Sequence, residues 1–246
     1  MSLKDKVIVV TGASRGLGKS LCLALGKEGV IVVAAARKLD GPRSAGETAG
    51  LVVAQGGKAL PVQCDIGVPD QVEALMDTAI RQLGRIDGLV NNAGVLIYGS
   101  ILELTVEDWN TTMSANLTGP FLCCKYALPN MIERRQGSIV NVSSTLAGRY
   151  KENNLAYGPS KAALDRFTLN LAGDMKQYNI AVNSLCPGRL ATEMIDTRFR
   201  PADPPEFGVS PILWMLQQDA FTFTGQMIER KDFGITYGPG IATKKE

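Results

Sequence analysis

Tyr157 and Lys161 are the two residues whose types and spacing most clearly suggest catalysis. They stand four residues apart in a segment with helical periodicity, so their side chains share one helix face. A free phenol has a pKa of about 10 and is a poor base near pH 7, but a neighbouring ammonium favours the phenolate and lowers that pKa. Such a pair is common on helix surfaces, so its meaning depends on the rest of the chain.

The sequence contains no histidine. Catalysis by Ser-His-Asp or Cys-His is therefore excluded, as are the zinc sites that draw on imidazole, and we expect no metal. Proton transfer near neutral pH has to come from Tyr, Lys, Asp, Glu or Cys, which agrees with a catalytic Tyr-Lys pair. The five cysteines are scattered without a CxxC pair, as expected for buried thiols in a reducing compartment.

A glycine-rich turn stands where the first expected strand meets the first expected helix. Glycines let the backbone approach a pyrophosphate, whose charge the helix N-terminus stabilises. The spacing is GxxxGxG, not the commoner GxGxxG, and ordinary strand-to-helix turns also contain glycine. The position at the first βα junction favours dinucleotide binding. The expected contacts are Gly12, Ser14, Arg15, Gly16, Leu17 and Gly18.

The elements that position these residues alternate between short β-branched runs and amphipathic stretches of helical length. We expect strands at 7–11, 30–36, 59–64, 88–91, 138–142, 181–185 and 226–228, and helices at 17–28, 44–55, 69–83, 106–133, 156–177 and 207–218. This alternation predicts an α/β fold: a doubly wound, Rossmann-type parallel sheet of about seven strands with helices on both faces. We expect a single domain over 1–246, with the long loop 189–206 as a substrate lid.

The charge is nearly balanced, with 26 basic and 24 acidic residues and a net charge of +2. This balance gives no reason to expect nucleic acid or an anionic membrane as a partner. The polar N-terminal residues do not form a signal peptide, and no apolar run approaches the roughly 20 residues that span a bilayer. We therefore expect a soluble, cytoplasmic protein.

Five motifs, in this order, resemble the short-chain dehydrogenase/reductase family over essentially the whole chain. They are the glycine turn, Asn91-Asn92-Ala93-Gly94, Ser144, Tyr157-x-x-x-Lys161 and Pro187-Gly188. The resemblance implies an NAD(P)-dependent oxidoreductase that transfers hydride between nicotinamide and a substrate carbon. It assigns catalysis to Asn116, Ser144, Tyr157 and Lys161. Ser144 would stabilise the charge on the reacting oxygen, and Asn116 would hold a water in a proton relay.

The same resemblance implies further contacts with the cofactor. Asp65 matches an adenine-contacting position, and Thr192 is a plausible partner of the carboxamide. Asn91 and Asn92 can equally serve only to stabilise the strand-to-helix turn. The residues that the resemblance assigns to the cofactor are Asp65, Ile66, Asn91, Ala93, Gly94, Tyr157, Lys161, Pro187, Gly188 and Thr192.

The end of the second strand bears on the choice between NAD(H) and NADP(H). An acid there binds the ribose 2′-hydroxyl, whereas an arginine accommodates a 2′-phosphate. Ala36 stands where NAD-preferring relatives usually carry an acid, Arg37 follows it, and Arg15 lies in the glycine turn. Two arginines can meet on one phosphate, so we predict that NADP(H) is favoured over NAD(H). The alternative is that both arginines are solvated surface residues.

These observations predict an NADPH-dependent reductase of a small, largely apolar carbonyl compound, with Tyr157 as the proton donor and alcohol oxidation as the reverse reaction. By resemblance, the substrate pocket draws on residues 96–98, 146–150 and the lid. Two alternatives stay open: a catalytically idle NADP(H)-binding sensor or scaffold, and an NAD-dependent alcohol dehydrogenase. Relatives form homodimers or homotetramers through the helices expected at 106–133 and 156–177, and we expect the same assembly here.

Overall fold

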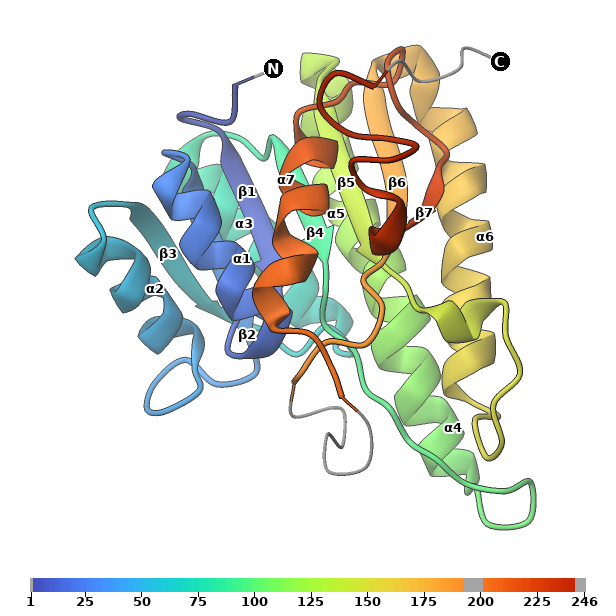
Figure 1. Ribbon diagram of the computed structural model, residues 1–246. Helices are drawn as coiled ribbons and strands as arrows, with labels where there is room; N and C mark the ends of the chain where they lie inside the picture. Colours follow the sequence, from blue (N-terminus) through green and yellow to red (C-terminus); the bar gives the residue numbers. More distant parts are fainter. Residues whose placement is uncertain (1, 193–200, 242–246) are drawn as a thin grey trace.

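The computed structural model describes residues 2–192 and 201–241. Its centre is a parallel seven-stranded sheet in the order β3-β2-β1-β4-β5-β6-β7 (Figure 1). The strands are β1 (Val7–Thr11), β2 (Ile31–Ala36), β3 (Lys58–Gln63), β4 (Gly88–Asn91), β5 (Gly137–Val142), β6 (Ile180–Cys186) and β7 (Met227–Glu229). The strand order reverses between β1 and β4, and ligands of such sheets bind at this switch point, beyond the carboxyl ends of the strands. The predicted Rossmann-type α/β fold is confirmed.

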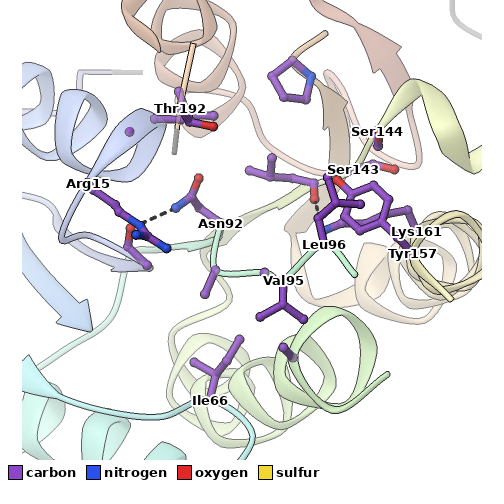
Figure 2. Close-up of a pocket in the computed structure, with 18 of the residues that line it drawn as sticks. Arg15, Ile66, Asn92, Val95, Leu96, Ser143, Ser144, Tyr157, Lys161 and Thr192 are labelled. Carbon is purple, nitrogen blue, oxygen red and sulfur yellow. Dashed lines mark hydrogen bonds between the residues drawn. The ribbon is translucent and has the colours of Figure 1, made fainter. Parts of the chain in front are cut away.

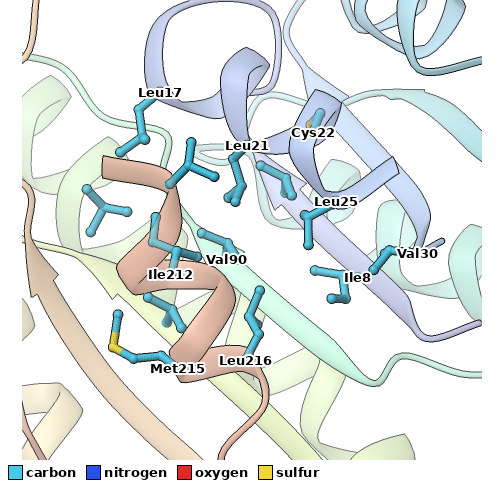
Figure 3. Packing of buried hydrophobic residues seen from close by; sticks show 14 of the residues in the cluster. Ile8, Leu17, Leu21, Cys22, Leu25, Val30, Val90, Ile212, Met215 and Leu216 are labelled. Atoms are coloured by element: carbon cyan, nitrogen blue, oxygen red, sulfur yellow. The ribbon is translucent and has the colours of Figure 1, made fainter. Parts of the chain in front are cut away.

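Helices cover both faces of the sheet (Figure 1). One face carries α1 (Gly16–Lys27), α2 (Ala45–Ala54) and α7 (Val209–Leu216), and the other carries α3 (Pro69–Leu83), α5 (Gly119–Arg134) and α6 (Tyr157–Met175). Successive residues of β1 point to opposite faces of the sheet. Ile8 packs in the hydrophobic cluster beneath α1, α2 and α7, the first cluster, and Val9 packs in the second cluster, beneath α3, α5 and α6. Figure 3 shows Leu21 of α1 and Ile212 of α7 in the first cluster. Both strand faces are therefore buried, as the apolar strand sequences predict.

The predicted boundaries agree with the structure to within two residues, with one exception. The single helix expected at 106–133 is wrong, because a π-helical turn (Ser114–Thr118) separates α4 (Val106–Met113) from α5. In that turn the Gly119 N–H donates to the Ser114 carbonyl, five residues back. Pro120 has no N–H to donate to the carbonyl of Asn116, which gives a physical reason for the irregularity. Such turns are frequent at functional sites.

The loop expected to form a lid, 189–206, is described only at its two ends, because residues 193–200 lie outside the described part of the chain. The two ends pair with one another. The Ala191 N–H donates to the Asp203 carbonyl over 2.7 Å, and the Asp203 N–H donates to the Arg189 carbonyl over 3.0 Å. The described ends thus form a short two-stranded connection between β6 and α7.

All five cysteines are buried and free of disulfides, as expected from their scattered positions. Within residues 2–192 and 201–241, none of the helices has the length and apolar character required to cross a membrane.

Candidate active site

A cavity of about 1810 Å³ opens beyond the carboxyl ends of the central strands. Figure 2 shows Arg15, Asn92 and Thr192 on one side of it and Ser144, Tyr157 and Lys161 on the other. Most of the residues predicted from the sequence line this one cavity: Gly12, Ser14, Arg15, Gly16, Leu17, Arg37, Asp65, Ile66, Ala93, Gly94, Ser144, Tyr157, Lys161, Pro187, Gly188 and Thr192. Gly18, Asn91 and Asn116 do not line it.

The glycine turn needs its glycines for two different reasons. Gly12 and Gly16 have positive φ angles of 66° and 52°, which side chains disfavour. Gly18 instead packs the start of α1 against the turn, because a Cβ there would lie 2.3 Å from the Gly12 carbonyl oxygen. Arg15, the N-cap of α1, is extended and makes no side-chain capping bond. The N-terminus of α1 therefore presents its backbone N–H groups in the manner of an anion site.

Asn92 fastens this turn to the end of β4. Its Nδ2 donates to the carbonyls of Thr11 over 2.9 Å and Gly12 over 3.3 Å, and its backbone N–H donates to Thr11 Oγ1 over 3.1 Å. Asn91 is buried instead, and its Nδ2 donates to Asn141 Oδ1 over 2.8 Å. Asn92 thus reaches the cavity, whereas the structure does not bring Asn91 to it. The sequence analysis left the two residues undecided and included only Asn91 among the cofactor contacts.

The cavity is strongly cationic where it meets the end of β2. The predicted Arg15 and Arg37 both line it, and they are joined there by Lys38 and Arg43. Asp40, the acid of the same loop, is not among the described lining residues. Sequence reasoning missed Lys38 and Arg43, although their charges are visible in the loop, because nothing in the sequence shows which way the loop 38–44 folds. The four cations suit a phosphate group.

Tyr157, Lys161 and Ser144 gather at the other side of the cavity. Tyr157 is the first residue of α6, and both it and Lys161 are buried, with 8% and 3% exposure. Lys161 Nζ donates to the Val142 carbonyl over 2.8 Å and lies 5.8 Å from the centre of the Tyr157 ring. Ser144 follows β5, and its side chain hydrogen-bonds with that of Tyr157. One buried face of α6 and the end of β5 thus bring a phenol, an ammonium and a hydroxyl to one place.

Burial shifts the pKa values of the two titratable groups towards their neutral forms. Burial raises the pKa of Tyr157 to about 12, although the hydrogen bond with Ser144 lowers it. Burial lowers the pKa of Lys161 to about 8, although the carboxylate of Asp165 raises it. The sequence predicts that the Lys161 ammonium lowers the pKa of the phenol, but burial is the largest influence on this pKa and raises it, and the group that lowers it is Ser144. At neutral pH Tyr157 therefore keeps its proton and Lys161 is mostly charged.

Asn116 lies behind the cavity wall, in the π-helical turn. Its Oδ1 accepts the Val95 N–H over 2.9 Å, and its Nδ2 donates to the Val95 carbonyl over 2.9 Å and to Ser160 Oγ over 3.0 Å. A Cβ placed on Gly94 would lie 3.0 Å from Asn116 Oδ1 and 3.6 Å from Lys161 Nζ. Asn116 is therefore a neighbour of Lys161, and its side chain holds the backbone that follows β4.

Apolar and cationic side chains share the part of the wall that surrounds Tyr157. Tyr98 and Leu146 line it together with Arg149, Lys151 and Arg189. Lys151 Nζ donates to the Tyr98 hydroxyl over 2.7 Å and lies 4.6 Å from the centre of that ring. The largely apolar pocket expected from the sequence thus also carries a basic rim.

Comparisons with known proteins agree with this geometry. The family model for short chain dehydrogenases matches residues 6–202. The chain is 34% identical over 195 residues to a 3-oxoacyl-[acyl-carrier-protein] reductase of Synechocystis sp., covering 79% of this chain and 78% of that one. It is 31% identical over 253 residues to Glucose 1-dehydrogenase 2 of Bacillus subtilis, covering 96% and 97%.

A solved structure shares the fold over nearly its whole length. It is described as an NAD(P) dependent gluconate 5-dehydrogenase from Beutenbergia cavernae with bound NADP, at low occupancy. The two chains align with a TM-score of 0.86 and 25% identity, covering 93% of this chain and 96% of that one. The names of these three similar proteins refer to different substrates, so similarity alone does not select a substrate.

Proposed function

Because the chain belongs to the short-chain dehydrogenase/reductase family, and is therefore an NAD(P)-dependent oxidoreductase of hydroxyl or carbonyl groups, we propose that it is an NADPH-dependent carbonyl reductase. One observation carries the proposal. A single cavity joins the glycine turn, a group of four cations, and the buried Tyr157 with Lys161 and Ser144. A dinucleotide with an additional phosphate needs the first two features, and proton transfer to a carbonyl oxygen needs the third.

The residues present fit an NADP(H) molecule. The absence of side chains at Gly12 and Gly18 allows the close turn at the start of α1, whose N–H groups would hold the pyrophosphate. Arg15 and Arg37 would hold the 2′-phosphate with charge-assisted hydrogen bonds. The remaining contacts would come from Asp65 and Ile66 for the adenine and from Pro187, Gly188 and Thr192 for the nicotinamide, with Ala93 and Gly94 also lining the cavity.

The proposed reaction joins a hydride and a proton to a carbonyl group. A bound reduced nicotinamide supplies the hydride for the carbonyl carbon. Ser144 donates a hydrogen bond to the carbonyl oxygen and stabilises its developing charge, while the Tyr157 hydroxyl gives that oxygen its proton. The Lys161 ammonium stabilises the phenolate that results, and the product is the alcohol. A phenol with a pKa of about 12 holds its proton at neutral pH, which favours reduction as the working direction.

We propose a substrate that is largely apolar near its carbonyl group and carries an anionic group further away. Tyr98 and Leu146 support the apolar part, and the rim of Arg149, Lys151 and Arg189 supports the anion. Within the described part of the cavity, Asp65 is the one carboxylate among the lining residues. Matched pairs of aldehydes that bear a carboxylate or its methyl ester would test the anion, with a higher kcat/KM expected for the carboxylate.

The first experiment follows the consumption of reduced nicotinamide against a broad carbonyl panel, with NADPH and NADH in parallel. We expect the wild type to oxidise NADPH preferentially and Tyr157→Phe to bind NADPH without turnover. Arg37→Asp should shift the preference towards NADH, because a carboxylate repels the 2′-phosphate and accepts a ribose hydroxyl. Relative affinities unchanged in Arg37→Asp would contradict the cofactor proposal. Binding of NADPH without turnover of any carbonyl class would favour the idle sensor or scaffold.

We also propose that the chain forms a homodimer or homotetramer. Large apolar side chains are exposed along the two helical regions expected to pair: Val106 and Trp109 on α4, Phe121 on α5 and Leu169 on α6, with exposures of 77%, 40%, 45% and 38%. Large apolar side chains that stay exposed on neighbouring helices are what a protein interface would cover. Light scattering at micromolar concentration tests the proposal, and a monomer alone would contradict it.

A further inference from the structure

We infer that Arg230 is a positioning residue that holds the nicotinamide side of the cofactor wall in place, an inference that rests on the proposed function. This wall is the segment 187–192, five residues of which line the cavity. Arg230 lies directly after β7, in a part of the chain that the cavity does not reach. It would act on the cofactor only through the backbone that it holds.

Arg230 joins three segments that are far apart in the sequence. Its Nε donates to the Pro187 carbonyl over 2.8 Å, at the start of the wall. Its Nη2 forms an ion pair with Asp203, on the returning end of the loop. The guanidinium also lies 5.7 Å from the centre of the Phe207 ring, within the range of a cation–π contact. One planar, forked side chain therefore ties β7 to both ends of the loop.

The ties at Asp203 and Pro187 act on the same short connection. The backbone hydrogen bonds between Asp203 and residues 189 and 191 fasten the wall to the returning end of the loop. These bonds hold the two ends of the loop to each other, and the wall is continuous with the sheet through β6; Arg230 adds a second link, from both ends of the loop to the end of β7. The Arg230 side chain is 20% exposed and that of Asp203 is 48% exposed, so water screens the ion pair and the hydrogen bond to the Pro187 carbonyl is the main tie.

The wall itself leaves little room for movement. Gly188 has a positive φ of 73° and lies against the guanidinium, because a Cβ there would be 3.5 Å from Arg230 Nη2. At the other end of the wall, Thr192 lies against the glycine turn, since a Cβ on Gly16 would be 2.9 Å from Thr192 Cγ2. A displaced Pro187 would therefore carry the wall away from the pyrophosphate turn. Arg230 sets the distance between the wall and the pyrophosphate turn from the Pro187 end of the wall.

The test measures the dissociation constant of NADPH directly, from the change in its fluorescence on binding and without any substrate. Arg230→Met keeps a flexible, unbranched stem, although a shorter one, and removes the charge and the donors of the side chain. We expect the dissociation constant and the KM for NADPH to rise by about tenfold, the order of effect of losing a hydrogen bond to a charged group. The kcat at saturating NADPH should change little, because Arg230 touches no reacting atom.

Lys231→Met is the matched control. Lys231 is the next residue, its side chain is 63% exposed, and its ion pair is with Glu229 of β7, over 3.0 Å, in place of a residue of the wall. We expect wild-type affinity from it. Arg230→Lys should give an intermediate affinity, because an ammonium can pair with Asp203 but cannot reproduce the fork that also reaches Pro187. The double variant Asp203→Asn, Arg230→Met should bind NADPH no more weakly than Arg230→Met alone, because the two residues act through one contact.

Each outcome decides a separate point. An unchanged NADPH affinity in Arg230→Met would overturn the inference. So would a loss of affinity that only follows a lower unfolding temperature, because the role would then be merely structural. A selective loss of affinity, with a melting temperature within a few degrees of wild type and a normal control, supports it. A wild type that binds neither NADPH nor NADH would instead overturn the proposed function, and with it the premise of this inference.

Discussion

The buried ammonium of Lys161 should make the protein less stable at neutral pH than at high pH, and Lys161→Met should remove this dependence. Lys161 is 3% exposed, and its Nζ donates to the Val142 carbonyl. Burial lowers the pKa of Lys161 from 10.5 to about 8. A pKa difference between folded and unfolded chains is also a dependence of folding free energy on pH. Methionine keeps the length and shape of the side chain but does not titrate.

The size of the effect follows from the shifted pKa. Below about pH 8 the lysine is charged in both states, and the folded state bears the full desolvation penalty. Between about pH 8 and 10.5 the unfolded chain binds more protons than the folded chain, so the free energy of unfolding rises with pH. A drop from 10.5 to about 8 corresponds to about 3 kcal/mol, at about 1.4 kcal/mol for each factor of ten. As the pH rises through this interval, the free energy of unfolding of the wild type should increase by this amount relative to that of Lys161→Met.

The assay is urea unfolding of both proteins at a fixed protein concentration, from pH 7 to pH 10. The difference between the two free energies of unfolding isolates Lys161, because the other titrating groups are common to both proteins. The loss of a donor to Val142 adds an offset that does not vary with pH. A difference that stays constant from pH 7 to 10 would refute the reasoning. It would mean that the ammonium is solvated or paired in the folded protein, and that its burial does not bear on its pKa.

Three further predictions follow from the site and the surface. Carbonyl reduction should weaken as pH rises above about 8, because Lys161 then loses the charge that stabilises the phenolate; a pH profile of kcat/KM checks this, and a flat profile up to pH 9 would contradict it. Gly18→Ala should abolish or strongly weaken NADPH binding in a titration, since its Cβ would meet backbone at 2.3 Å, whereas Gly50→Ala, where a Cβ meets nothing within 4 Å, should bind normally. Trp109→Glu should lower the oligomeric state in light scattering, by placing a charge in the apolar surface of α4.

The strands were predictable because their chemistry is local. The strands from β1 to β6, apart from β3 at the sheet edge, are short β-branched or apolar runs buried on both faces, and the alternation with amphipathic stretches leaves few topologies. The capping box also shows in the sequence, since Thr105 and Asp108 form the two reciprocal bonds over 3.0 and 3.1 Å. The helix expected at 106–133 was wrong because the apolar pattern continues through the interruption. Pro120 was the available signal, since it removes the donor for the carbonyl four residues earlier.

The site was less predictable where it depends on the direction of single side chains. Asn91 and Asn92 are adjacent, and a strand that ended one residue earlier would exchange their roles. The sequence shows that Lys38 and Arg43 are charged, but whether they line the cavity depends on the path of a seven-residue loop. Arg230 is the extreme case, because its partners lie 27 and 43 residues away. Long-range contacts of this kind leave no spacing pattern in a single sequence.

The two shifted pKa values together explain how a protein without histidine can supply protons near neutral pH. A phenolate at Tyr157, whose conjugate acid has a pKa of about 12, is a much stronger base than Lys161, whose pKa is about 8. In the proposed reaction, the proton that Tyr157 gives to the substrate is therefore replaced downhill from Lys161. A lysine with that pKa can both release and recover a proton close to neutral pH, whereas an unshifted lysine holds its proton there. In the proposed reaction, burial thus lets Lys161 exchange protons near neutral pH, as histidine does in other enzymes. Burial also keeps Tyr157 protonated, ready to donate its proton to the substrate.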